Sequence, residues 1–260
     1  MGRALPGTML VTGAGRGIGR AIADRFLAAG WRVGLADVDE DAVGAAAAGR
    51  AGAVPLRLDV RDAGQWAEAL TSFCGEGPLH VLVNNAGVLA SGPFADMPPE
   101  AHRRMVEVNV AGVVQGATAA HRYLCRSGRG LLLNLCSASA LYGQPTLATY
   151  GATKAAVKSL TEALDLEWRA DRIRVRDLLP LFVDTEMVSR DGREASSVAR
   201  LGVRLRADDV ADAAWRVVHE RRVPLRSPHR PVGRQTRRLM AASAVSPDWA
   251  TRLVMRRLAP

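Results

Sequence analysis

Residues 8–19 read TMLVTGAGRGIG, an apolar run that passes directly into a loop with four glycines. The run has the length and composition of a buried strand, and Ile18, Ile22 and Phe26 give the following residues the period of a helix. Glycines between a strand and a helix let the backbone turn tightly and approach a diphosphate, whose charge the helix N-terminus meets. On its own such a loop fits a structural turn equally well.

The same alternation of strand and helix continues along the chain. Further strands are predicted at 32–37, 54–60, 80–87, 131–137 and 173–180, and helices at 18–29, 62–73, about 100–126 and 149–168. Strands that alternate with helices of this length form a parallel sheet with helices on both faces. The sequence therefore predicts an α/β chain: a single-domain Rossmann fold built on a doubly wound parallel sheet.

Composition changes after residue 222. Residues 221–260 contain ten arginines and one acid, Asp248, so the whole net charge of +9 lies in this tail. We expect a dinucleotide-binding catalytic domain over 1–222 and an Arg-rich extension over 223–260 that packs on the domain or on a partner. Pro247 and Asp248 predict the start of a basic amphipathic helix, which makes a peripheral membrane contact the alternative. No nucleic-acid motif accompanies the charge.

The remaining composition is that of a soluble protein, with 48% hydrophobic and 23% charged residues. No apolar run approaches the roughly 20 residues that span a bilayer, and the N-terminus lacks the long apolar segment of a signal peptide. Cys74, Cys125 and Cys136 are not clustered, and the five histidines show no ligand spacing. We therefore expect a cytoplasmic protein without a metal site.

Asp37 ends the second predicted strand, after the glycine loop. A carboxylate at this point can accept both hydroxyls of an adenosine ribose, and it repels a 2′-phosphate, which favours NAD(H) over NADP(H). Arg16, inside the loop, indicates the opposite, because a guanidinium can bind a 2′-phosphate. Asp37 carries more weight, since it would lie directly at the ribose edge.

Lysine is rare in this chain: of 35 basic residues only Lys154 and Lys158 are lysines. Tyr150 and Lys154 lie four residues apart on a predicted helix, and therefore on one face. An ammonium beside a tyrosine favours the phenolate and moves its pKa from about 10 toward neutral pH, where the tyrosine can act as a base. Taken alone, the pair would also fit an exposed Tyr and Lys on an amphipathic helix.

Five motifs in order resemble the short-chain dehydrogenase/reductase family: TGAGRGIG (12–19), NNAG (84–87), Asn109 in VEVNVAG, Ser137 after the fifth strand, and YGATK (150–154). The resemblance implies that Tyr150 exchanges a proton with the substrate oxygen, Ser137 binds that oxygen, and Lys154 lowers the tyrosine pKa and holds the nicotinamide ribose. It also implies that Asn109 holds a water in a proton relay. The implied cofactor-binding residues are Gly13, Gly15, Arg16, Gly17, Ile18, Gly19, Asp37, Asp59, Val60, Asn85, Ala86, Gly87, Tyr150, Lys154, Val183 and Thr185.

The implied activity is hydride transfer between NAD(H) and a small alcohol or ketone. The alternatives are a non-catalytic dinucleotide-binding sensor or scaffold, and an NADP-dependent ketoreductase of lipid metabolism. Leu181 stands where the family pattern has glycine, and with Phe182, Met187, Leu141, Tyr142 and Leu147 it indicates an apolar substrate pocket. A homodimer or homotetramer is implied, the dimer through the helices at 100–126 and 149–168.

Overall fold

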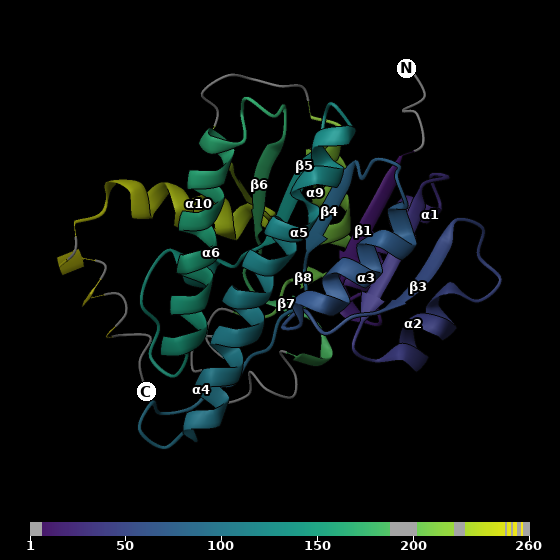
Figure 1. Ribbon diagram of the computed structural model, residues 1–260. Helices are drawn as coiled ribbons and strands as arrows, with labels where there is room; N and C mark the ends of the chain where they lie inside the picture. The colour runs from purple at the N-terminus through teal and green to yellow at the C-terminus, as the bar shows by residue number, and fades with distance from the viewer. Residues whose placement is uncertain are drawn as a thin grey trace.

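A seven-stranded parallel sheet forms the centre of the computed structural model, with strand order β3-β2-β1-β4-β5-β6-β9 (Figure 1). The structure describes residues 7–187, 202–220, 227–247, 249–250, 252–253 and 256. The strands of this sheet are β1 (Thr8–Thr12), β2 (Arg32–Asp37), β3 (Ala53–Arg57), β4 (Val81–Asn84), β5 (Leu131–Leu135), β6 (Arg174–Leu179) and β9 (His229–Pro231). Two further strands, β7 (Val183–Asp184) and β8 (Leu205–Arg206), pair with each other.

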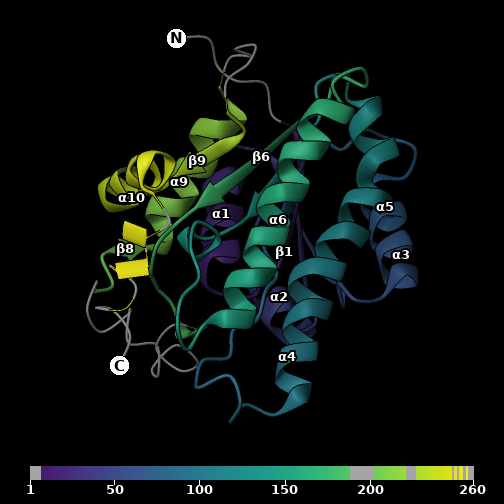
Figure 2. The same ribbon diagram turned by 90° about the vertical axis from the view of Figure 1, so that its left-hand side faces the viewer.

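Helices cover both faces of the sheet (Figure 2). One core joins the sheet to α1 (Gly17–Leu27), α2 (Glu40–Ala47) and α9 (Ala207–Val218). A second core joins the other face to α3 (Ala63–Cys74), α5 (Gly112–Arg126) and the end of α6 (Ala148–Glu167). The remaining helices are α4 (Pro99–Val106) and α10 (Gly233–Val245). The predicted doubly wound α/β fold is confirmed.

The central strands are apolar because both of their faces are covered. All five residues of β5 are buried, and Met9, Leu10 and Val11 of β1 have no exposed surface. Continuous apolar runs, rather than alternating ones, are typical of parallel strands between two helical layers.

The structure differs from the predicted elements at several places, and α9, α10, β7 and β8 have no counterpart among them. The helix expected at about 100–126 contains a π-helical segment, Glu107–Ala111, between α4 and α5. The sheet also takes a last strand, β9, from residues beyond 222. The division of the chain at residue 222 therefore does not coincide with the edge of the sheet. The basic helix expected from Pro247 onward lies largely outside the described residues.

Ionisable groups attach β9 to its neighbours, and two of them, His229 and Asp177, are buried. His229 bonds through Nδ1 to Asp177 of β6 at 2.7 Å and through Nε2 to Glu162 of α6 at 2.7 Å. Lys158, the second of the two lysines, donates to Glu162 at 2.5 Å. Burial opposes the charged imidazole, but the two carboxylates outweigh it and raise the pKa of His229 above its ordinary value.

We expect a His229→Gln variant to lose about 3 kcal/mol of unfolding free energy at pH 6, as when one partner of a buried ion pair is removed. Because the folded-state pKa of His229 is raised, its stabilising contribution is complete below the ordinary value of 6.5 and declines as pH rises through the raised pKa. Urea unfolding at pH 6 and pH 9 measures this. A His219→Gln control changes an exposed histidine of the same half of the chain. If the loss of unfolding free energy in His229→Gln were larger at pH 9 than at pH 6, the raised pKa of His229 would be contradicted.

Candidate active site

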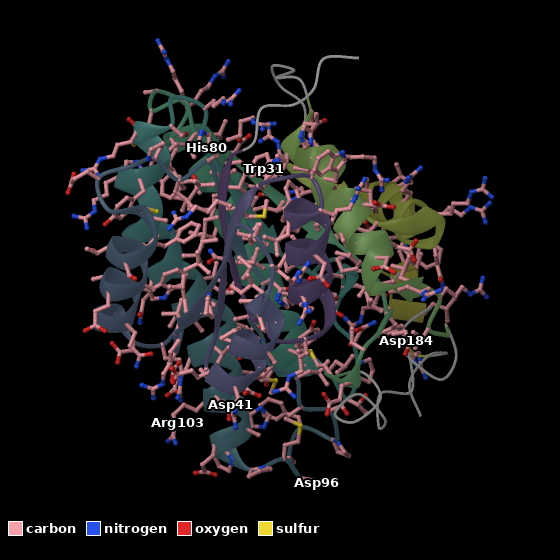
Figure 3. The ribbon with its side chains drawn as sticks, turned by 90° about the vertical axis from the view of Figure 1, so that its right-hand side faces the viewer. Trp31, Asp41, His80, Asp96, Arg103 and Asp184 are labelled. Carbon is pink, nitrogen blue, oxygen red and sulfur yellow. The ribbon has the colours of Figure 1, made fainter. Side chains whose placement is uncertain are left out.

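The carboxyl ends of the parallel strands meet at one edge of the sheet, where most of the predicted site residues lie. Figure 3 shows this end of the molecule with Asp41 and Asp184, while Trp31 and His80 lie at the opposite end. Ligands of open α/β sheets bind outside the carboxyl ends, where the strand order reverses. Here that reversal falls between β1 and β4.

The glycine loop packs too tightly for side chains. Gly13 has φ +64° and Gly17 has φ +55°, in the left-handed region that favours glycine. A Cβ on Gly19 would lie 2.2 Å from the carbonyl oxygen of Gly13. Within the described residues no side chain caps the start of α1, so its first N–H groups remain directed toward the loop. The loop and Ile18 therefore present a backbone cradle for a diphosphate.

Thr12 and Asn85 connect the ends of β1 and β4. The Thr12 Oγ1 accepts from the backbone N–H groups of Asn85 and Ala86, both at 3.0 Å. The Asn85 amide donates back to the carbonyls of Thr12 at 2.7 Å and Gly13 at 3.2 Å. Thr12 is missing from the predicted site, although it stands at the start of the glycine motif. Its hydroxyl holds the backbone at the end of β4 against the start of the glycine loop.

Asp37 faces the glycine loop. Its carboxylate accepts from the N–H of Gly15 at 3.0 Å and from that of Asp39 at 3.2 Å. Arg16 is drawn toward other acids, with 3.6 Å to Asp39 and 3.3 Å to Glu186. These carboxylates balance the guanidinium charge, so the surroundings of Asp37 disfavour a further anion.

Asp59 and Val60 follow β3 at the same edge. Arg61 holds the Asp59 carboxylate at 2.6 Å, and this hydrogen bond lowers the pKa of Asp59. Val60 packs so closely on the start of α5 that a Cβ on Gly112 would approach it to 2.7 Å. Both Asp59 carboxylate oxygens accept from the Arg61 side chain, and the pair lies at the protein surface.

Tyr150, Ser137 and Lys154 converge at the ends of β4 and β5. Burial raises the pKa of Tyr150 to about 12, and a hydrogen bond with Ser137 acts in the opposite direction. The Lys154 Nζ lies 5.7 Å from the centre of the Tyr150 ring and donates to the Leu135 carbonyl at 2.8 Å. Burial lowers the pKa of Lys154. The structure thus brings the predicted Ser, Tyr and Lys together in a partly enclosed site.

A buried chain of polar groups continues from Ser137. Ser137 donates to the hydroxyl of Ser139 at 3.1 Å, Ser139 donates to Gln144 Oε1 at 3.1 Å, and Gln144 donates to the hydroxyl of Tyr142 at 3.2 Å. Ser139 and Gln144 are not among the predicted site residues, yet both are only 4% exposed. Irregular loops have no periodicity from which such burial can be read.

Asn109 lies in the π-helical segment and is fully buried. Its side chain binds the backbone of Val88 in both directions, accepting at 2.8 Å and donating at 2.9 Å, and donates to Thr153 at 3.2 Å. Asn109 therefore links the loop after β4 to α6, beside Lys154. A Cβ on Gly87 would lie 3.2 Å from Asn109 Oδ1 and 3.8 Å from Lys154 Nζ, so this loop also runs close to the lysine.

The segment after β6 approaches the glycine loop. Val183 belongs to the buried core, and the methyl of Thr185 lies 3.6 Å from the position of a Cβ on Gly17. Leu181 and Phe182 are 9% and 8% exposed and pack with Ala138 and Leu239 of α10. The leucine that replaces the expected glycine thus anchors α10 as well as lying near the site.

Comparisons with known proteins agree with this geometry. The short chain dehydrogenase family model matches residues 7–195. The chain is 36% identical over 188 residues to the 3-alpha-(or 20-beta)-hydroxysteroid dehydrogenase of Mycobacterium bovis, covering 72% of each chain.

Two solved structures illustrate the similarity in three dimensions. A 3-ketoacyl-(acyl-carrier-protein) reductase from Brucella melitensis, complexed with NADH, has a TM-score of 0.80 at 29% identity, covering 87% of this chain and 96% of that one. A gluconate 5-dehydrogenase from Burkholderia cenocepacia, complexed with NADP and tartrate, has a TM-score of 0.74 at 29% identity, covering 82% and 89%. With its seven-stranded sheet, glycine loop and converging Ser, Tyr and Lys, the chain belongs to the short-chain dehydrogenase family.

Proposed function

We propose that this protein transfers a hydride between NAD(H) and an alcohol or carbonyl substrate, with Tyr150 as general acid and base. The observation that carries the proposal is the convergence of Ser137, Tyr150 and Lys154 at the carboxyl edge of the sheet, beside the glycine loop. A protein that only sensed or scaffolded a dinucleotide would not need this set.

The residues fit a nicotinamide dinucleotide. The cradle formed by Gly13, Gly15 and Gly19 has no space for side chains but exposes backbone N–H groups to a diphosphate. Asp37, Asp59 and the Asn85–Gly87 loop surround it as the family resemblance implies. When bound, the dinucleotide supplies the hydride acceptor or donor.

The chain's own residues would manage the proton and the reacting oxygen. The Ser137 hydroxyl, which donates to Ser139 in the structure, would turn to donate to the substrate oxygen and hold it beside Tyr150, which gives or takes the proton at that oxygen. Because burial raises the pKa of Tyr150 to about 12, an ammonium at Lys154 is needed to favour the phenolate. Asn109 positions the loop next to Lys154 through Val88 and Thr153.

We assign NAD(H) rather than NADP(H) on electrostatic grounds. A 2′-phosphate at the ribose edge would meet Asp37 and Asp39, while Arg16, the cation of the glycine loop, already pairs with Asp39 and Glu186. An NADP-dependent ketoreductase of lipid metabolism is therefore the second candidate. The apolar residues around the site, including Leu141 and Met187, favour an apolar substrate.

We also propose a homodimer through α5 and α6. The exposed surface of α5 includes Val114, 42% exposed, and that of α6 includes Leu166, 71% exposed. Small residues at Ala152, Ala155 and Ala156 of α6 would let two helices approach closely.

Among the described helices none has the length and apolar character to cross a membrane. For the Arg-rich extension over 223–260, packing on the domain or a partner is the first proposal, and a peripheral membrane contact through its basic residues is the second.

A Tyr150→Phe variant is expected to lose about 10²–10⁴-fold in turnover, the range for removal of a general acid or base. Its NADH affinity should stay within about twofold of wild type, because the hydroxyl is proposed to act on the substrate oxygen. Steady-state kinetics with apolar secondary alcohols and NAD⁺, together with NADH fluorescence titration, separates the two effects. Full turnover in this variant would refute Tyr150 as the proton carrier.

An Asp37→Ala variant should weaken NADH binding by about tenfold, the loss of about 1.4 kcal/mol expected for hydrogen bonds to a charged group. NADPH binding should improve, since the repulsion of a 2′-phosphate is relieved. Asp41→Ala, an exposed acid on the same side of the molecule, serves as the matched control (Figure 3). Equal effects of the two substitutions on the NADH-to-NADPH affinity ratio would mean that Asp37 does not read the ribose.

A further inference from the structure

Three side chains of metal-ligand type meet at the end of the molecule away from the proposed active site. His121 and Cys125 are one turn apart near the end of α5, and Asp171 lies in the turn between α6 and β6. One ligand atom from each residue lies within 4.8 Å of the others. The turn precedes the amino end of β6, whereas Ser137 and the glycine loop follow the carboxyl ends of their strands.

The distances suit a common metal ion. The His121 Nε2 lies 3.0 Å from Asp171 Oδ2, and the Cys125 Sγ lies 3.7 Å from the imidazole nitrogens. A tetrahedral zinc ion has ligand distances of about 2.0–2.1 Å to His nitrogen and about 2.3 Å to Cys sulfur, which separates these two atoms by roughly 3.6 Å. The observed separation matches this value, but the sulfur is equally far from both ring nitrogens, so the Cys125 side chain must rotate to bring it in front of the Nε2 lone pair.

The surroundings hold the ligands in place and leave an entry path. Trp168, 8% exposed, packs edge-on against the His121 ring with centroids 4.7 Å apart. The N–H of Asp171 donates to the Trp168 carbonyl at 3.1 Å, which fixes the turn. The His121 and Asp171 side chains are 35% and 43% exposed, so an ion and a water ligand can reach them.

We propose that His121, Cys125 and Asp171 form a site for one divalent transition-metal ion such as Zn²⁺, with water in the fourth position. The set combines nitrogen, sulfur and oxygen ligands, which suit zinc better than magnesium or calcium. A thiolate, a carboxylate and a neutral imidazole together neutralise the two positive charges. The metal would join α5 to the α6–β6 turn, which are 50 residues apart in sequence at His121 and Asp171.

Without a metal ion, His121 Nε2 and Asp171 Oδ2 lie within hydrogen-bond distance, 3.0 Å. Burial and the nearby Asp171 charge raise the pKa of the Cys125 thiol, so the thiol is protonated at neutral pH. Metal binding therefore releases a proton, as is usual for cysteine ligands. The contact between His121 and Asp171 orients the imidazole toward the carboxylate.

The test is a Co²⁺ titration of the full chain under reducing conditions, followed by the thiolate-to-cobalt absorption band. We expect one equivalent to bind, Zn²⁺ to displace it, and the band to disappear in Cys125→Ser. His121→Ala and Asp171→Asn should each weaken Co²⁺ binding at least tenfold, because even changes outside the ligand shell of metal sites cost about that much. Cys74→Ser, which changes the other half-buried thiol, is the matched control and should bind as wild type does.

Two further measurements keep the outcome decisive. Circular dichroism and NADH binding, which depends on the opposite edge of the sheet, verify that each variant is folded. Thermal unfolding with Zn²⁺ should shift upward for wild type and Cys74→Ser, but not for Cys125→Ser. The proposal is overturned if no thiolate band appears, if the band persists in Cys125→Ser, or if His121→Ala and Asp171→Asn bind Co²⁺ as tightly as wild type.

Discussion

The hydrogen bonds between Thr12 and the Asn85–Ala86 backbone are the contact on which the rest of the site depends. They hold the ends of β1 and β4 together at the point where the strand order reverses. The returning bonds from the Asn85 amide to Thr12 and Gly13 fix the first turn of the glycine loop. Gly19 must remain a glycine for the same reason, since a Cβ there would lie 2.5 Å from the Asn85 amide nitrogen. Through these contacts the start of α1 and the loop after β4 keep fixed positions.

Burial then decides the chemistry of the site. It raises the pKa of Tyr150 and lowers that of Lys154, so both groups are driven toward their neutral forms. Proton exchange at Tyr150 therefore requires neighbouring dipoles and charges that offset the cost of burying a charged group. Ser137 supplies one such contact, and its own hydroxyl is held by the chain through Ser139 and Gln144. The hydrogen bonds along this chain orient the Ser137 hydroxyl, which the family motifs in the sequence do not specify.

The sequence predicted the regular parts of this structure well, because parallel strands between helices leave continuous apolar runs. The predicted strands and helices through β6 agree with the structure to within a few residues. β9 was missed because it has three residues, His229, Arg230 and Pro231, and is held by its ion pairs rather than by an apolar pattern. Gln144 was missed because its burial lies in an irregular loop. The grouping of His121 with Cys125 and Asp171 requires contact between distant segments, which spacing along one helix cannot indicate.

The most direct test of the account is a titration of the purified protein with NADH and, separately, with NADPH, followed by nicotinamide fluorescence. We expect NADH to bind more tightly, because Asp37 and Asp39 lie beside the glycine loop and Arg16 is already paired with carboxylates. Tighter binding of NADPH would mean that Arg16 reads a 2′-phosphate and that the assignment of Asp37 is wrong. Binding of neither dinucleotide would contradict the proposed oxidoreductase function itself.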